Sequence, residues 1–230
     1  RAWKITETAE EAQPMIPDIK LNNISMLNLG WLRESINFPA PQSQSNTIVV
    51  PRRNSPIRYT ESLGRVSYQP RTFDITLSCL KYREDFNRMA DEIINRFAGR
   101  LVNVSLSEEP ALYCVGTLEI TPGYDLLTHK GQLAISSTDG DAYRYHTTET
   151  VVIQNGNGTA VLTNDFMPAV PTVTVPDETT LKWQVGTDRF IKTVSAGTWT
   201  FPELELSQGE NEIEVTTGGM VTFRYREGRL

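Results

Sequence analysis

The chain has 230 residues, a formal net charge of -6, 39% hydrophobic residues and a mean hydropathy of -0.34. This composition is typical of a globular protein and argues against a disordered chain, while the acidic balance argues against nucleic-acid binding as its main task. No run approaches the roughly 20 apolar residues of a membrane helix, and residues 1–5 lack the apolar segment of a signal peptide, so we expect neither.

The first third of the chain predicts short elements and long connections. Residues 1–15 are polar and predict a frayed or docking arm. Residues 16–25 alternate loosely around Asn22-Asn23, a turn signal, and a strand is expected at 29–37. A connector rich in proline, serine and glutamine follows at 38–47.

The segment at about 51–65, PRRNSPIRYTESLGR, has little apolar periodicity. A loop of this length in a compact domain is usually functional, so we interpret it as an extended arm that reaches a partner. Because arginine is favoured at interfaces, the predicted subunit contacts are Arg52, Arg53, Arg58, Tyr59 and Arg65. A nucleic-acid function fits the basic stretch less well, since few stacking aromatic residues accompany it.

The middle of the chain predicts an α+β domain over residues 16–146, an antiparallel sheet with one helix. The alternation at 66–80 predicts a strand. Residues 81–98 predict a helix that ends at Gly99, with the apolar stripe Tyr82, Phe86, Met89, Ile93 and Phe97. Further strands are expected at 100–106, 111–121 and 131–137, with a turn at Pro122-Gly123.

The chain changes character near residues 146–149. Residues 147–230 are net acidic and contain short β-rich segments separated by glycine turns, which predicts an all-β sandwich. The strands are expected at 148–153, 159–163, 170–175, 180–185, 189–194, 198–201, 211–217 and 220–226. The aromatic residues expected to fill its core are Trp183, Phe190, Trp199, Phe201 and Phe223.

No set of residues predicts an enzyme, a metal site or a cofactor site. The two cysteines, Cys79 and Cys114, lie on alternating apolar faces and are expected to be buried; a disulfide between them is left open. His129 is expected in a surface turn, and no nucleophile motif occurs in the chain. His146 is expected in an aromatic-rich hinge, where Asp139 and Asp141 lack the spacing of metal ligands. We therefore expect a protein without catalytic residues.

Two tryptophans leave a carbohydrate-binding alternative open. Aromatic faces stack on sugar rings, so Trp183 and Trp199 could line a glycan site. The competing interpretation places both indoles in the sandwich core. The carboxylates of the last third mostly alternate with apolar residues, which is typical of the outer face of strands rather than of a glycosidase pair.

Several motifs, in their order and spacing, resemble the distal tail proteins of siphophages and prophages. Ser62–Leu77 resembles the family's Gly/Arg segment before a long strand. The helix Glu84–Phe97 with Gly99-Arg100 resembles its single helix, and Ser107–Tyr113 its acidic-Pro-Tyr hairpin. Gly140–Tyr145 is similar to the Asp-Pro-Tyr closure, although Ala142 replaces the proline, and Val221–Leu230 resembles the final strand of a galectin-like domain.

The resemblance covers residues from about 16 to 230 and is densest over 60–146. One further departure concerns the family's Pro-Gly-Arg-Asp-Gly run, where this chain has Pro51–Pro56. The resemblance implies a homohexameric ring formed by the N-terminal domains, with the arm around a neighbour and galectin-like sandwiches projecting outward.

The resemblance also implies a location and partners. The protein would belong to the virion, in the phage tail, after synthesis in the bacterial cytoplasm. Its partners would be the tail tube protein, tail-tip or receptor-binding proteins, and itself, without nucleic acid or membrane. The main hypothesis is thus a structural hub at the baseplate that joins the tail tube to the tail tip. The alternatives are a carbohydrate-binding module that recognises host wall glycans and, with least support, a tail-associated hydrolase.

Overall fold

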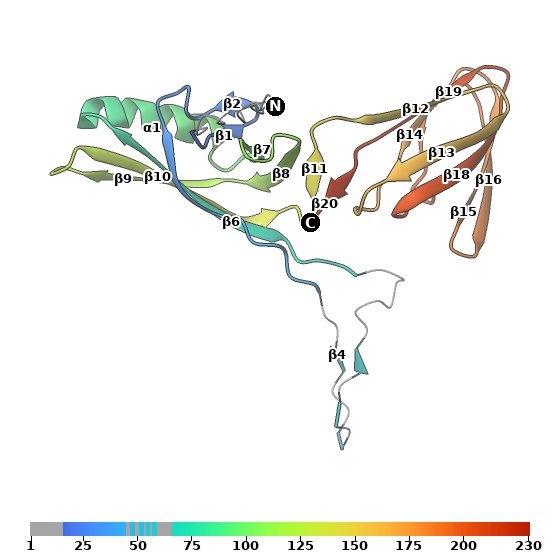
Figure 1. Cartoon of the computed structure of the whole chain (residues 1–230), viewed down its shortest axis with the longest axis horizontal. Helices are drawn as coiled ribbons and strands as arrows, with labels where there is room; N and C mark the ends of the chain where they lie inside the picture. The colour runs from blue at the N-terminus through green and yellow to red at the C-terminus, as the bar shows by residue number, and fades with distance from the viewer. Residues whose placement is uncertain (1–15, 45–46, 49–50, 53, 56, 59–65) are drawn as a thin grey trace, which may run out of the picture.

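The computed structural model describes residues 16–44, 47–48, 51–52, 54–55, 57–58 and 66–230. These residues are mostly β-strand, the paired strands run antiparallel, and they include one α-helix, which confirms the predicted antiparallel strands and helix. Figure 1 shows the helix and its sheets at one end, a second group of strands at the other, and an arm extending away from both.

Six strands form the first sheet, in the order β2-β1-β7-β8-β11-β20. They are β1 (Ile19–Leu21), β2 (Ile24–Ser25), β7 (Leu101–Leu106), β8 (Leu112–Thr117), β11 (Arg144–His146) and β20 (Gly228–Arg229). Asn22 and Asn23 join the first two with φ angles of 47° and 66°, which is typical of a two-residue hairpin turn and confirms the predicted turn. The pairing of β20 with β11 was not expected from the sequence.

Four strands form the second sheet, in the order β3-β6-β10-β9. They are β3 (Leu32–Asn37), β6 (Arg71–Leu80), β9 (Glu119–Asp125) and β10 (Lys130–Gly140). The prediction of one strand at 111–121 is wrong, because the chain passes from β8 to β9 at Leu118 and so changes sheet. The turn predicted at Pro122-Gly123 is also wrong, since both residues lie inside β9. That strand is the outer one of its sheet, where a proline is tolerated.

The helix α1 (Arg83–Phe97) packs against β9 and β10. Its buried residues include Phe86, Ile93 and Phe97 from the predicted stripe, whereas Tyr82 lies outside the helix and is exposed. Gly99 follows the helix with a φ of 67°, as expected of a glycine cap. The helix and the sheets share one core, whose largest fully buried side chains include Trp31, Phe73 and Phe97.

The strand predicted at 29–37 begins later, at Leu32. Residues 26–30 instead form a turn, in which the backbone N–H groups of Leu29 and Trp31 donate to the carbonyl of Met26. Met26 and Trp31 are both buried in the core. The turn is therefore stabilised by the apolar side chains at its two ends.

The remaining strands form two four-stranded sheets, named here the C-terminal sheet pair. One has the order β12-β19-β14-β17 and the other β13-β18-β15-β16. They are β12 (Thr150–Asn155), β13 (Gly158–Asn164), β14 (Thr172–Val175), β15 (Thr179–Val185), β16 (Asp188–Val194), β17 (Gly197–Thr200), β18 (Gly209–Thr216) and β19 (Met220–Tyr225). Each falls at a predicted segment, and all of them except β17, whose residues are all exposed, include residues that alternate in burial.

The sheet pair has its own cluster of buried side chains, drawn from both sheets. Phe223 and Ile213 are fully buried, and Trp183 stacks on Phe190 with ring centroids 5.5 Å apart. Trp199 does not fill this core as predicted, since 38% of it is exposed on the outer strand β17. The domain boundary at residue 146 stays a prediction.

The two cysteines are free thiols and do not form a disulfide with each other. Both are buried, as predicted. Cys79 lies on β6 and Cys114 on β8. Burial raises the pKa of Cys79 and raises the pKa of Cys114 to about 11. Thiols in such settings stay protonated and unreactive at neutral pH.

Candidate interaction arm and the groove at its root

The arm leaves the second sheet as two antiparallel chain segments. Near the sheet, the N–H of Gln44 donates to the carbonyl of Ser67 at 2.7 Å, and the N–H of Gln69 donates to that of Gln42 at 2.8 Å. Further out, β4 (Thr47–Ile48) pairs with β5 (Ile57–Arg58). The strand predicted at 66–80 begins only at Arg71 because residues 67–69 belong to this arm. In Figure 1 the arm extends away from both groups of sheets.

Arg71 anchors the root of the arm. This arginine is 2% exposed at the start of β6. Its guanidinium donates to the carbonyl of Pro39 at 2.6 Å and to that of Ala142 at 3.1 Å, and it lies over the Phe38 ring. Burial lowers the pKa of Arg71, but a guanidinium remains charged at neutral pH. Its donors thus join both sides of the arm root to the segment before β11.

The structure describes only some of the residues that were predicted to contact a neighbouring subunit. Arg52 is exposed, with a φ of 69°, and the backbone of Arg58 ends β5. Arg53, Tyr59 and Arg65 lie outside the described residues. The structure therefore places Arg52 and the backbone of Arg58 on the arm, and the contact role of all five residues stays a prediction.

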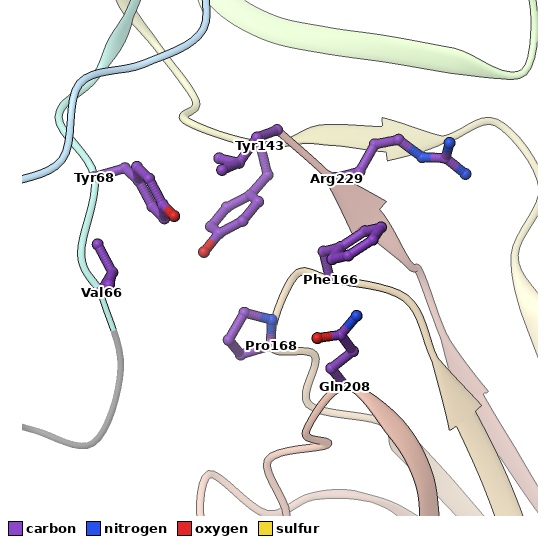
Figure 2. A pocket seen from close by; sticks show the side chains of 8 residues that line it. Val66, Tyr68, Tyr143, Phe166, Pro168, Gln208 and Arg229 are labelled. Carbon is purple, nitrogen blue, oxygen red and sulfur yellow. The ribbon is translucent and has the colours of Figure 1, made fainter. Parts of the chain in front are cut away.

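A groove of about 500 Å³ lies where the arm root, the segment before β11 and the C-terminal sheet pair come together. Figure 2 shows Val66 and Tyr68 on one side and Phe166 and Pro168 on the other, with the Tyr143 ring between them. Gln208, Arg229 and Leu230 complete the lining. Tyr68 and Tyr143 contact each other edge to face, with centroids 5.8 Å apart.

No sequence pattern indicated this groove. Its lining residues come from segments that are far apart in the chain, and neither Phe166 nor Pro168 stands in a recognisable motif. The signals that could have pointed to part of it were Tyr68, beside the predicted arm, and Tyr143, in the predicted hinge.

The two tryptophans proposed for glycan contact lie on different sheets. Trp183, on β15, is 5% exposed, and its indole N–H donates to the carbonyl of Glu203. Trp199, on β17, donates to the carbonyl of Ser195 and keeps part of its ring exposed. Trp183 therefore offers no free ring face for a sugar, and a glycan contact at Trp199 stays a prediction.

The two histidines contact groups other than a nucleophile. His129 lies in the exposed turn before β10, where its Nδ1 is 3.2 Å from the Tyr124 hydroxyl. His146 is on β11, and its Nε2 is 3.1 Å from Asp165 Oδ2. Among the described residues, no group of three or more His, Cys, Asp or Glu side chains is placed to hold a metal ion. The same residues include no helix long and apolar enough to span a membrane.

The fold is shared with a protein of a phage adsorption apparatus. One solved structure with this fold is the Dit protein (gp 19.1) of phage SPP1, described as a paradigm of the hub adsorption apparatus in phages that infect Gram-positive bacteria. The similarity has a TM-score of 0.69 and 12% sequence identity, and it covers 94% of this chain and 100% of that chain. No known protein-family profile matches the sequence, and no curated protein sequence matches it either.

Proposed function

We propose that this protein is a structural component of a bacteriophage tail, a distal tail protein that forms the hub between the tail tube and the tail tip. The observation that carries the proposal is the fold shared with SPP1 Dit over 94% of the chain. The ordered motifs between Ser62 and Tyr145 support the same family from the sequence alone.

In this proposal the chain has two domains and assembles as a homohexameric ring. Residues 16–146, together with the returning strand β20, make the ring, and a galectin-like sandwich within residues 147–227 projects from it. The arm of each subunit contacts a neighbour through Arg52, Arg53, Arg58, Tyr59 and Arg65. Such a head-to-tail contact, repeated around a closed ring, joins unlike surfaces of one chain.

The proposed partners are the tail tube protein on one face of the ring and tail-tip or receptor-binding proteins on the other. The proposal gives the chain no catalytic role and no cofactor. It places the protein in the virion tail, after synthesis in the host cytoplasm.

The test is the assembly state of the purified full chain. Mass photometry and negative-stain electron microscopy are expected to show a six-fold ring, either alone or after addition of the tail tube protein. A strict monomer under both conditions would contradict the ring, and a ring of different symmetry would contradict the hexamer.

The arm is tested by replacing Arg52, Arg53 and Arg58 with alanine. We expect the triple variant to lose the ring while keeping its fold, as judged by circular dichroism. The matched control replaces Arg88, Arg96 and Arg100, three exposed arginines on or next to the helix, and removes the same charge. If both variants assemble equally, the arm has no role in the contact.

A further inference from the structure

Two chain segments cross between the N-terminal sheets and the C-terminal sheet pair. One runs from β11 towards β12, and the other runs from β19 to β20. Backbone hydrogen bonds join them, since the N–H of His146 donates to the carbonyl of Glu227 at 2.9 Å and Tyr145 pairs with Gly228. The Thr150 hydroxyl also donates to the Glu227 carboxylate at 2.6 Å. The segments therefore cross as a paired ribbon.

The crossing is polar, whereas the regions on either side of it are apolar. The two clusters of buried residues have no member in common, and none of residues 141–149 is buried. Arg226 donates to the carbonyls of His146 and Thr147 at 2.7 and 2.8 Å and lies over the Tyr113 ring. An interface without a shared apolar core opens at low cost, and motion of its two sides is the ordinary outcome.

Asp165 holds this crossing from the side of the sheet pair. Its Oδ2 lies 3.1 Å from His146 Nε2 and 3.2 Å from Arg229 Nη2, so one carboxylate contacts both crossing segments. The loop that carries it is itself held, because the buried amide of Asn164 donates to the carbonyls of Met167 and Leu206. The N–H of Met167 donates to the carbonyl of Gly228 at 2.9 Å.

Gly228 allows the close approach of the loop and the ribbon. A Cβ atom at this position would lie 2.8 Å from the carbonyl oxygen of Arg144 and 3.1 Å from Met167 Sδ. The first of these is a backbone atom that cannot rotate away. A side chain at residue 228 is thus incompatible with the pairing of β20 and β11.

We propose that the contacts of Asp165 with His146 and Arg229 form a releasable clamp. This clamp sets the orientation of the C-terminal sheet pair relative to the N-terminal sheets. When the clamp is closed, the Asp165 carboxylate contacts His146 and Arg229 and fixes the orientation of the sheet pair. With it open, the two apolar cores stay folded and the sheet pair pivots on the crossing ribbon. The proposal concerns the single chain and does not require the ring or the tail role.

The test is the distance distribution between spin labels on the two regions, measured by pulsed electron paramagnetic resonance. Labels at Asp91→Cys on the helix and Thr216→Cys on β18 are both exposed, and the buried native thiols are expected not to react. Labelled chain is diluted in unlabelled chain so that only distances within one chain contribute. We expect one narrow distribution, roughly two-fold broader in Asp165→Asn.

Matched controls separate the clamp from a general loss of charge or of glycine. Asp188→Asn removes an exposed carboxylate of the same sheet pair and is expected to leave the distribution unchanged. Gly228→Ala is expected to broaden it, whereas Gly123→Ala, with open space around its Cβ, is not. A distribution in folded Asp165→Asn equal to that of the unsubstituted chain would overturn the proposal.

A measurement without substitution at the clamp covers the case in which Asp165→Asn does not fold. In about 1 M salt, where ionic contacts are strongly screened, the otherwise unsubstituted labelled chain is expected to show the broader distribution while circular dichroism stays native. A distribution that remains narrow under these conditions would overturn the clamp by itself.

Discussion

The two cores of this chain are built in different ways. In the N-terminal core a helix lies on sheets, and Gly131 of β10 makes room for it, because a Cβ at that position would lie 2.1 Å from the Phe86 ring. In the C-terminal core two sheets face each other, and side chains such as Phe223 and Ile213 fill the space between them. Both cores contain large buried side chains, but the helix can lie on its sheet only because residue 131 has no side chain.

The largest expected effect is on the sheet pair. Phe223→Ala removes a fully buried ring and leaves a cavity, so we expect a loss of about 3–5 kcal/mol. If the two cores are independent, calorimetry will show one unfolding transition shifted and the other unchanged. A single transition that shifts as a whole would show that the cores unfold together.

The matching change in the N-terminal core is Gly131→Ala. The added methyl overlaps the Phe86 ring, which is held between Trp31 and Tyr124, so we expect overpacking to cost about 2–3 kcal/mol. The measurement is chemical unfolding followed by circular dichroism. Gly123→Ala on the neighbouring strand is the control and is expected to change stability by less than about 0.5 kcal/mol.

A smaller effect is expected at Trp199. Because its ring lies partly exposed on an outer strand, Trp199→Ala is expected to cost about 1 kcal/mol, well below the about 3–5 kcal/mol expected for the buried Trp183→Ala. Glycan-array binding by the two folded variants tests the carbohydrate alternative. Binding by the unsubstituted chain that is lost only in Trp199→Ala would support it, and a silent array would argue against it.

The smallest effect is expected at the rim of the N-terminal core, where Arg33 of β3 forms an ion pair with Glu108 between β7 and β8. The Arg33 guanidinium lowers the pKa of Glu108 from 4.5 to about 2. A lowered folded-state pKa stabilises the protein above pH 4.5, and this contribution is lost as the pH falls towards 2.

Glu108 is half exposed, so screening keeps the contribution of this pair below about 1 kcal/mol. Glu108→Gln is therefore expected to lower stability slightly at pH 7 and not at about pH 2. Unfolding midpoints at both pH values check this. An equal loss at both pH values would assign the effect to packing instead of charge.

The C-terminal strands were predicted well because most of them alternate between turns, and the helix because its apolar stripe is followed by Gly99. The sequence-based prediction failed where the pairing of a strand depends on a segment far away in the chain. The two-residue pairing of β11 with β20 is too short to leave a periodic pattern, and the alternation across Leu118 continues although the chain changes sheet. Likewise, nothing local distinguishes buried Arg71 from the arginines of the arm, since its acceptors are Pro39 and Ala142.

The return of β20 to the first sheet has an architectural consequence. The chain leaves that sheet after β11 and re-enters it at the adjacent strand β20, so the strands of the C-terminal sheet pair are an insertion between two neighbouring strands of the first sheet. The two ends of this insertion lie side by side, because Tyr145 pairs with Gly228. Because an insertion with closely spaced ends leaves the pairing of the flanking strands in place, this position is expected to tolerate replacement of the C-terminal sheet pair by another segment.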